Sequence, residues 1–360
     1  MPLFRVLARA TLFALSSTLL SACSISTQSE IIELRFLEPD TYSSLTERTL
    51  QSMVKARDIS ETYSTGGLYL LTQYGDREAV FERENQRLIE TSFISQSWRF
   101  CSVFSSTSND STVILGRNWD NQNVGSIIVS LNHPSEGYSS ITISRAIDLA
   151  FPENLDLMGM RSDPFGERFL LAPFYCMDGI NEHGLCIAVA GVRHTVHSES
   201  NKGERIFITF LIRKILDQTR NIEEAVELAG KYVPFMLDKD SLDGHLHITD
   251  SSGRSVILEY ENDRWLTIQT DKSWQALTNK PMYEVPDEVL RESCWRYRCI
   301  SETLETSGGK TDWMSGLQIL RDVTQGGTTW SAVYSPTDRD LYLVVYQNWD
   351  KIYHIQAFQQ

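Results

Sequence analysis

The chain has little of what several protein classes require. It has only six cysteines in 360 residues and no repeat or low-complexity tract. The composition is that of an ordinary globular protein. The apolar run near the start, residues 10–22, is shorter than the ~20 residues that a membrane-spanning helix needs. Basic residues are also in deficit, since 33 Lys and Arg stand against 47 Asp and Glu, giving a net charge of −14. An acidic surface repels phosphate backbones, so no nucleic acid partner is expected.

The first residues predict export rather than a membrane span. Arg5 and Arg9 precede the apolar run and small residues close it, which is typical of a secretory signal. The LSAC segment ending at Cys23 resembles the bacterial lipobox, in which the cysteine becomes the lipid-bearing first residue. We therefore predict a lipoprotein signal peptide over 1–22 and a lipid anchor on Cys23, which tethers the protein to a membrane of the bacterial cell envelope, facing the periplasm or the exterior. An ordinary secretion signal with an unmodified cysteine is the alternative.

Metal sites and disulfides are weakly indicated. His245 and His247 share a strand face and His194 and His197 have ligand-like spacing, but no cysteine or carboxylate cluster stands near either pair. We therefore expect no metal and no cofactor. Four cysteines outside the signal and the proposed nucleophile allow three disulfide pairings, and free buried thiols fit equally well: Cys176, Cys186, Cys294 and Cys299.

Secondary-structure signals change in character at Cys101. Before it we predict a tether over 24–37, a helix over 41–57, a strand or turn over 65–75 and an amphipathic stretch over 77–90. After it, short segments rich in β-branched residues alternate with turn residues, and 108–111 is the predicted turn of a hairpin that Cys101 begins.

Further along, helices and strands alternate in blocks. The order predicts two antiparallel sheets between helical layers, an α+β fold. The helices are expected over 203–219, 221–233 (capped by Asn221), 286–305 and 311–323, and the strands over 245–251, 254–260, 329–335, 341–347 and 351–356.

Two charged residues downstream of Cys101 indicate that this cysteine has a catalytic role. Arg117 lies sixteen and Asp120 nineteen positions downstream, and a thiol, a guanidinium and a carboxylate around one strand pair can build a nucleophile without histidine. A cut before Cys101 would free an α-amine that serves as the base. Because the spacing between Arg117 and Asp120 is odd, the strand is expected to end or bulge near 116–118 so that both reach the thiol. The alternatives are a buried, inert cysteine and a surface ion pair.

Five sequence blocks, in order, resemble the choloylglycine hydrolase and penicillin V acylase family of N-terminal-nucleophile amide hydrolases. The resemblance covers residues 101 to the C-terminus and implies a four-layer αββα sandwich. The blocks are CSVF with GRNWD from Cys101, DGINEHGL over 178–185, HLHITDSSGRSVILEY over 245–260, ALTNKP over 276–281 and SCWRYR over 293–298.

The resemblance also implies roles for single residues. They are the nucleophile, a cation that favours the thiolate, an acid that orients the amine, an oxyanion donor and a second active-site cation: Cys101, Arg117, Asp120, Asn279 and Arg296, respectively. Where the family has a second oxyanion residue, this chain has Gly191, which can offer only its backbone N–H. Asp178, Asn181 and Glu259 are interpreted as structural, the first two as shaping a turn.

Together these observations predict a membrane-anchored cysteine amidohydrolase. It would cleave the linear C–N amide bond of a small acyl amide through a thioester, after cutting itself before Cys101 as in the acyltransferase and acid ceramidase branches. Residues 23–100 would then be a tether and propeptide-like helical segment, and 101–360 the hydrolase domain. The alternatives are an acyltransferase of the same fold, an uncleaved Cys-His thiol hydrolase and a non-catalytic lipoprotein binding module. Association of the two fragments, homo-oligomers and the identity of the acyl amide stay open.

Overall fold

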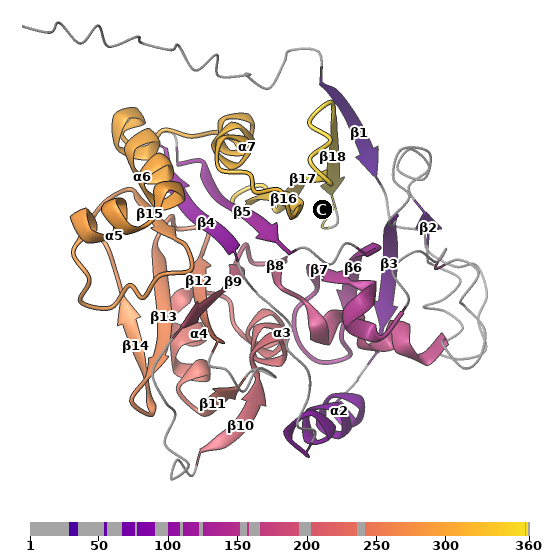
Figure 1. The fold of residues 1–360 in the computed structure, drawn as a ribbon. Coiled ribbons are helices and arrows are strands. Elements are labelled where there is room, and N and C mark those ends of the chain that lie inside the picture. Colours follow the sequence, from indigo (N-terminus) through magenta and orange to yellow (C-terminus); the bar gives the residue numbers. More distant parts are fainter. Residues whose placement is uncertain are drawn as a thin grey trace, which may run out of the picture.

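Two large β-sheets lie face to face, with helices on their outer sides (Figure 1). The computed structural model describes residues 29–34, 54–55, 67–75, 78–90, 100–108, 111–121, 125–151, 157, 166–193, 203–235, 242–356 and 358. The predicted signal peptide and Cys23 lie outside these residues. In the part of the chain that is described, no helix is long and apolar enough to cross a membrane.

The first sheet contains the hairpin that begins at Cys101. It has seven strands in the order β1-β18-β17-β16-β5-β4-β15, so the hairpin strands β4 and β5 lie between β16 and β15. The strands are β1 (Glu30–Leu34), β4 (Phe100–Thr107), β5 (Val113–Asp120), β15 (Trp274–Leu277), β16 (Thr328–Ser335), β17 (Asp340–Val345) and β18 (Lys351–Gln356).

The second sheet has nine strands in the order β14-β13-β12-β9-β8-β7-β6-β3-β2. Strands β10 (Glu204–Phe207) and β11 (Tyr232–Phe235) form a separate pair. The nine are β2 (Val54–Lys55), β3 (Leu68–Tyr74), β6 (Ile127–His133), β7 (Ser140–Arg145), β8 (Asp178–Asn181), β9 (Cys186–Arg193), β12 (Leu242–Thr249), β13 (Ser255–Glu261) and β14 (Arg264–Ile268).

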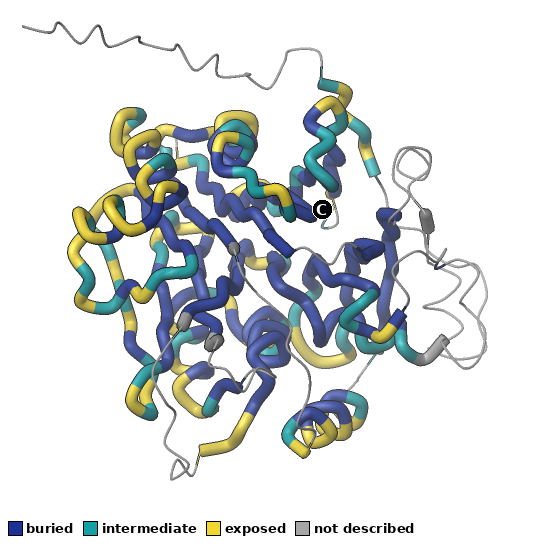
Figure 2. Tube along the Cα trace, viewed as in Figure 1, coloured by how far each residue is buried: buried dark blue, intermediate teal, exposed yellow. Residues whose placement is uncertain are grey.

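Helices complete the four layers and confirm the predicted αββα sandwich. Helices α6 and α7 pack on β4, β5, β15 and β16, while α3 and α4 pack on β8, β9 and β13. Figure 2 shows buried strands in the middle and exposed positions on the outer sides of the helices. The helices are α2 (Glu78–Glu90), α3 (Ile208–Gln218), α4 (Ile222–Ala229), α5 (Asp287–Ser293), α6 (Trp295–Ser307) and α7 (Trp313–Asp322), with 3-10 segments η2 (Ala146–Leu149) and η4 (Gly166–Tyr175).

The contact between the sheets forms the core around the hairpin. Strand β4 lies against β9 and β12 of the other sheet. The indole rings of Trp119 and Trp330 stack there with their centroids 5.4 Å apart, and both side chains are fully buried. The predicted cap of α4 is confirmed, because the Asn221 side chain accepts a 3.0 Å hydrogen bond from the Glu224 N–H.

The predicted end or bulge near 116–118 is wrong. Strand β5 runs unbroken from Val113 to Asp120 in regular register with β4, and the irregularity lies across from it in β16, between Thr328 and Trp330. Gly116 has another reason to be glycine. A Cβ at this position would meet the ring of Phe104 at 2.5 Å, so the residue provides space for that ring.

The segment before Cys101 contributes more strand than predicted. Within the expected tether, β1 pairs in parallel with β18, and within the expected helix over 41–57, residues 54–55 pair with β3. The other residues of that expected helix lie outside the described ones. Strand β3 and helix α2 confirm the predictions over 65–75 and 77–90, and β3 pairs in parallel with β6. Both sheets are thus antiparallel except where this segment joins them.

Three helix predictions need new bounds. The helix expected over 221–233 is α4, which ends at Ala229, because residues 232–235 form strand β11. The first turns expected over 203–219 form strand β10 instead, because its register with β11 satisfies that backbone, and α3 starts only at Ile208. The helix expected over 286–305 is two helices, α5 and α6, separated at Cys294, whose φ of −143° is extended.

Candidate active site

Cys101 lies at the start of β4, inside the molecule. It is fully buried and stands opposite Trp119 of β5. Its backbone N–H donates a 2.6 Å hydrogen bond to Oδ1 of Asn279, and its Sγ accepts from Nη2 of Arg117 at 3.7 Å. Burial raises the pKa of the thiol, whereas the charge of Arg117 acts to lower it. The thiol's hydrogen-bond partner is therefore a guanidinium and not a histidine.

Arg117 approaches the thiol from between the two sheets. Two positions along β5 from Trp119, it shares the face of the sheet that Cys101 occupies. Its side chain is fully buried over the Trp119 ring, with Cζ 4.6 Å from the ring centroid. It donates to the carbonyl oxygens of Met177 at 3.1 Å and Val189 at 3.2 Å. These contacts hold the guanidinium in one place.

Asp178 is the counter-ion of Arg117. The prediction that Asp178 shapes a turn is wrong. It begins strand β8 and forms a fully buried ion pair with Arg117, which lies in the other sheet. Tyr334 donates a short hydrogen bond to the same carboxylate, and Trp330 Nε1 donates at 3.3 Å. Burial raises the pKa of Asp178, and the charge of Arg117 opposes this. Sequence reasoning missed this role because a DG pair is typical of a turn and does not reveal burial.

Arg296 lies on the opposite face of β4. It comes from α6, and its guanidinium donates a short hydrogen bond to the carbonyl oxygen of Cys101 and a 3.0 Å bond to Ser102 Oγ. It also donates to Asn279 Oδ1 at 2.9 Å and lies 3.6 Å from Oδ2 of Asp120. One cation thus contacts the Cys101 side chain and the other its main chain.

Asp120 lies beside the peptide bond that precedes Cys101. The strand register pairs it with Phe100, and Thr328 donates a 2.5 Å hydrogen bond to its Oδ1. Burial raises the pKa of Asp120 to about 6, although Thr328 and the charges of Arg296 and Arg117 oppose the shift. The odd spacing from Arg117 is thus accommodated without a bulge, since the two residues reach Cys101 from different faces of one strand.

Asn279 joins the two sheets at this site. It follows β15 of the first sheet, and its Nδ2 donates a 2.7 Å hydrogen bond to the carbonyl oxygen of Gly191 in β9 of the second. Its Oδ1 accepts from both Cys101 and Arg296. Gly191 therefore contacts the site through its carbonyl oxygen. All five residues that the sequence singled out lie in one continuous group of contacts.

Metal ligation finds no support in the described residues. Among them, no group of three or more His, Cys, Asp or Glu side chains could hold a metal ion. His194 and His197 lie outside the described residues. None of the three disulfide pairings considered is formed. The described cysteines are all free: Cys101, Cys176, Cys186, Cys294 and Cys299. Asn181 is structural as predicted, since its side chain binds the backbone of Leu216 and Thr219.

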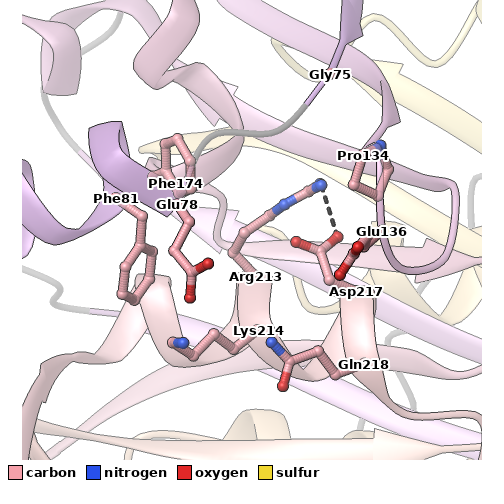
Figure 3. A pocket seen from close by; sticks show the side chains of 10 residues that line it. All are labelled: Gly75, Glu78, Phe81, Pro134, Glu136, Phe174, Arg213, Lys214, Asp217 and Gln218. Atoms are coloured by element: carbon pink, nitrogen blue, oxygen red, sulfur yellow. Dashed lines mark ion pairs between the residues drawn. The ribbon is translucent and has the colours of Figure 1, made fainter.

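A separate cavity of about 220 Å³ lies away from these residues (Figure 3). Gly75, Glu78 and Phe81 of the N-terminal segment line it together with Arg213 and Asp217 of α3, which are joined by an ion pair at 2.6 Å. None of the five candidate residues lines this cavity. It marks the seam between the segment before Cys101 and the rest of the fold.

Comparison with known proteins agrees with this geometry. Residues 101–308 match the model of "Linear amide C-N hydrolases, choloylglycine hydrolase family". Penicillin V acylase of Pectobacterium atrosepticum is 27% identical over 117 residues, which are 30% of this chain and 31% of that protein, so the match spans about a third of that relative.

A solved structure shows the same fold. A variant of conjugated bile acid hydrolase from Clostridium perfringens superposes with a TM-score of 0.51 at 14% identity, covering 71% of this chain and 92% of that one. Penicillin V acylase from Agrobacterium tumefaciens gives a TM-score of 0.49 at 15% identity, covering 71% and 86%.

Proposed function

Since the chain belongs to the choloylglycine hydrolase family of linear amide C-N hydrolases, we propose that it hydrolyses the C–N bond of a small acyl amide with Cys101 as the nucleophile. The observation that carries this proposal is the set of charged and polar side chains that contact Cys101. Arg117 contacts its sulfur, while Asn279 and Arg296 contact its main chain. An inert buried cysteine would need no such set of charged and polar partners.

The first proposed step cuts the chain before Cys101. The sulfur attacks the carbonyl carbon of Phe100, a thioester bond forms, the peptide C–N bond breaks, and the nitrogen takes up the thiol proton. Water then hydrolyses the thioester, leaving a carboxylate on Phe100 and a free α-amine on Cys101. The hydrogen bond from the Cys101 N–H to Asn279 and the position of Asp120 beside Phe100 support this step, because they fix the peptide group that reacts.

In turnover the new α-amine would act as the base. Its unperturbed pKa near 7.7–8.0 allows it to take the thiol proton at neutral pH. The thiolate, favoured by Arg117, attacks the substrate carbonyl. The leaving amine takes a proton, and water releases the acid from the thioester. Asp120 would orient the α-amine, and Asn279 would donate to the oxyanion, where loss of one donor typically costs about 2.7–4 kcal/mol.

The substrate class follows from the family. The relatives are described as acting on penicillin V and on conjugated bile acid. Both substrates carry an amide that joins an acyl group to a small head group. We therefore propose an acyl amide of this general kind.

Intact mass and turnover test the proposal together. We expect the active enzyme to contain a fragment of residues 101–360 and to hydrolyse members of a panel of acyl amides. Cys101→Ala should abolish both the cut and turnover, whereas Cys299→Ala, which removes a half-buried thiol outside the site, should leave both intact. An active preparation made only of uncut chain would refute the cut, and a cut chain that is inactive on the whole panel would refute the amidase.

A lipid anchor on Cys23 is a separate proposal, supported by the LSAC segment. It predicts a lipid-modified N-terminal peptide by mass spectrometry and release from membranes in Cys23→Ala. An unmodified N-terminal peptide starting at Cys23 would contradict it.

A further inference from the structure

A buried histidine and a buried glutamate meet beside the segment that carries Asn279. His245 of β12 and Glu259 of β13 are both fully buried. His245 Nδ1 lies 2.8 Å from Glu259 Oε1, and Nε2 lies 2.6 Å from the carbonyl oxygen of Thr278. Both ring nitrogens therefore face oxygen atoms, and His245 joins the Glu259 carboxylate to the backbone of Thr278.

Glu259 holds the other end of the same segment. Its Oε1 accepts from the Met282 N–H at 2.7 Å and its Oε2 from the Tyr283 N–H at 3.0 Å. Burial acts to raise the pKa of Glu259, but the hydrogen bond and charge of His245 and the two N–H groups outweigh it and hold the pKa below its ordinary value. The ion pair therefore binds residues 278, 282 and 283, and Asn279 lies between these attachment points.

The segment over 278–283 has no helix or strand of its own to fix it. Asn279 nevertheless has to meet Gly191, Cys101 and Arg296 at once, with distances of 2.6–2.9 Å. A displacement of about 1 Å at a reacting centre can cost on the order of 10²-fold in rate. Support for this segment is thus support for the proposed oxyanion donor.

The neighbouring histidine shows that the pair is a specific arrangement. His247 lies two residues along β12 and contacts Ser105 of β4 at 3.0 Å instead of the segment. Burial and the charge of His245 lower the pKa of His247 to about 3, so it is neutral. Of the two histidines, only His245 therefore joins Glu259 to the segment that carries Asn279.

We infer that His245 and Glu259 are positioning residues that place Asn279 for catalysis, an inference that rests on the proposed amidase function. Neither contacts Cys101, so they act through Asn279. The argument depends on geometry: one ion pair binds both ends of a short irregular segment, and the segment carries a side chain that touches the nucleophile.

A double-mutant cycle between Glu259 and Asn279 tests this. Glu259 receives three donors on two oxygens, and glutamine has one acceptor oxygen, so Glu259→Gln leaves at least one donor facing an NH₂ group. We expect kcat to fall about tenfold or more, with KM changed by less than about threefold. Asn279→Ala should lose about 10²–10³-fold in kcat. The double variant should lose no more than Asn279→Ala alone, to within about threefold.

The matched control is Glu261→Gln, two residues along the same strand and half-buried, which should keep wild-type kcat. His245→Gln provides a second variant if Glu259→Gln does not fold, since one amide cannot bind both Glu259 and Thr278. It should show the same dependence on Asn279. A folded Glu259→Gln with wild-type kcat, or losses that multiply in the double variant, would overturn the inference.

The wild type and Glu261→Gln decide the proposed function independently. Turnover by both, with multiplicative losses in the cycle, would leave the amidase standing and overturn the positioning role. Absence of turnover in the wild type would overturn both.

Discussion

Cys101 is held by two cations that have different tasks. Arg117 is fully buried between the sheets, where its ion pair with Asp178 fixes it against the sulfur. Arg296 comes from a surface helix and contacts the main chain of Cys101 on the other face. We therefore expect Arg117 to affect both the stability of the fold and the reactivity of the Cys101 thiol. Two variants distinguish these two effects.

Replacing Arg117 by glutamine should lower the free energy of unfolding. Asp178 would become an unpaired buried charge, which costs about 3–5 kcal/mol of unfolding free energy. Arg117→Gln with Asp178→Asn should regain much of that loss, because no buried charge remains. Denaturant titration measures the stability, and the rate of alkylation of the processed enzyme measures the thiol.

The alkylation rate should stay low in both of these variants, since neither has a cation in contact with the Cys101 sulfur. Asp178→Asn alone keeps the cation and serves as the control, with reactivity retained. Recovery of fast alkylation in the double variant would show that Arg117 is not what favours the thiolate.

Asp120 should cost stability at neutral pH. Burial raises its pKa to about 6 from the ordinary value of 3.8, so the folded state binds the proton more tightly than the unfolded state. Its favourable contribution is complete below pH 3.8 and is lost as the pH rises through about 6. In a Cys101→Ala background that keeps the chain uncut, Asp120→Asn should raise the unfolding free energy by about 1–3 kcal/mol at pH 7.

The same comparison at pH 4 should show almost no difference, because Asp120 is then protonated in the fold. Denaturant titrations at the two pH values measure this. A stability gain that is equal at pH 4 and pH 7 would contradict the shifted pKa. In the Cys101 enzyme, Asp120→Asn is expected to abolish turnover, which would mark a residue kept for function at a cost in stability.

The structure brings together the residues that the sequence singled out, but the sequence did not indicate which of their charges are paired. All five named residues converge, because the motif blocks fix which side chains are present. What the sequence could not reveal is which buried group balances which charge. Asp178 was interpreted as a turn residue and Glu259 as structural, since their partners Arg117 and His245 lie in strands whose neighbours only the folded sheets define.

At the scale of elements, Gly116 shows how a correct residue can receive the wrong explanation. A glycine in a strand often marks a bulge, but here it faces the ring of Phe104 across the β4–β5 pair. Gly116→Ala should lower the unfolding free energy by about 1–3 kcal/mol through overpacking. Adding Phe104→Leu should recover part of the loss.

Gly326→Ala is the matched control, because a Cβ there meets no atom within 4 Å. Thermal or denaturant unfolding of the four proteins provides the measurement. If Phe104→Leu brings no recovery, the backbone at Gly116 and not the space beside it requires glycine.

Strand prediction succeeded where both faces of a segment are apolar or β-branched and failed where pairing is remote. Strand β1 pairs with β18, more than 300 positions away, and three of its five residues are exposed. Strand β2 has two residues. Such short strands form because the edge strand of a sheet is available for pairing. The local sequence does not predict where that edge strand lies.

At the scale of the whole molecule, the segment before Cys101 belongs to both sheets. Strand β3 is buried along its length beside β6, and Leu68, Leu70 and Leu71 are fully buried. Each such side chain contributes about 1.5–3 kcal/mol when removed from water. Helix α2 adds Asn85, whose side chain donates to the Arg205 carbonyl and accepts from the Phe207 N–H, both at 3.0 Å.

A cut before Cys101 should therefore not release this segment. We expect the two fragments to elute together in size-exclusion chromatography under native conditions and to separate only in denaturant. Separation of fragments under native conditions would contradict the prediction. Leu70→Asp, which places a charge in the middle of β3, should weaken the association, whereas Glu82→Gln on the exposed side of α2 should not.

The attachment of β1 should depend on pH through His354. Its Nδ1 lies 2.8 Å from Glu33 of β1 and its Nε2 lies 2.9 Å from Asp340 of β17. Burial alone would lower the pKa of His354, but the two carboxylates outweigh it and raise the pKa above the ordinary value. The stabilisation is complete below about pH 6.5 and is lost as the pH rises through the raised pKa. Because the Glu33 side chain is 59% exposed, it should amount to about 1 kcal/mol or less.

Hydrogen exchange of the β1 amides, corrected for intrinsic rates, measures this attachment. Protection should fall between pH 6 and pH 9 in the wild type and should not change with pH in His354→Gln. His183→Gln removes a histidine that packs on Tyr138, outside the first sheet, and should behave as the wild type does. Protection that falls equally in His354→Gln would show that another group controls the strand. If the fall is confined to β1 while β3 keeps its protection, the segment loosens at one sheet and stays fixed in the other, as a fragment held by two separate strands should.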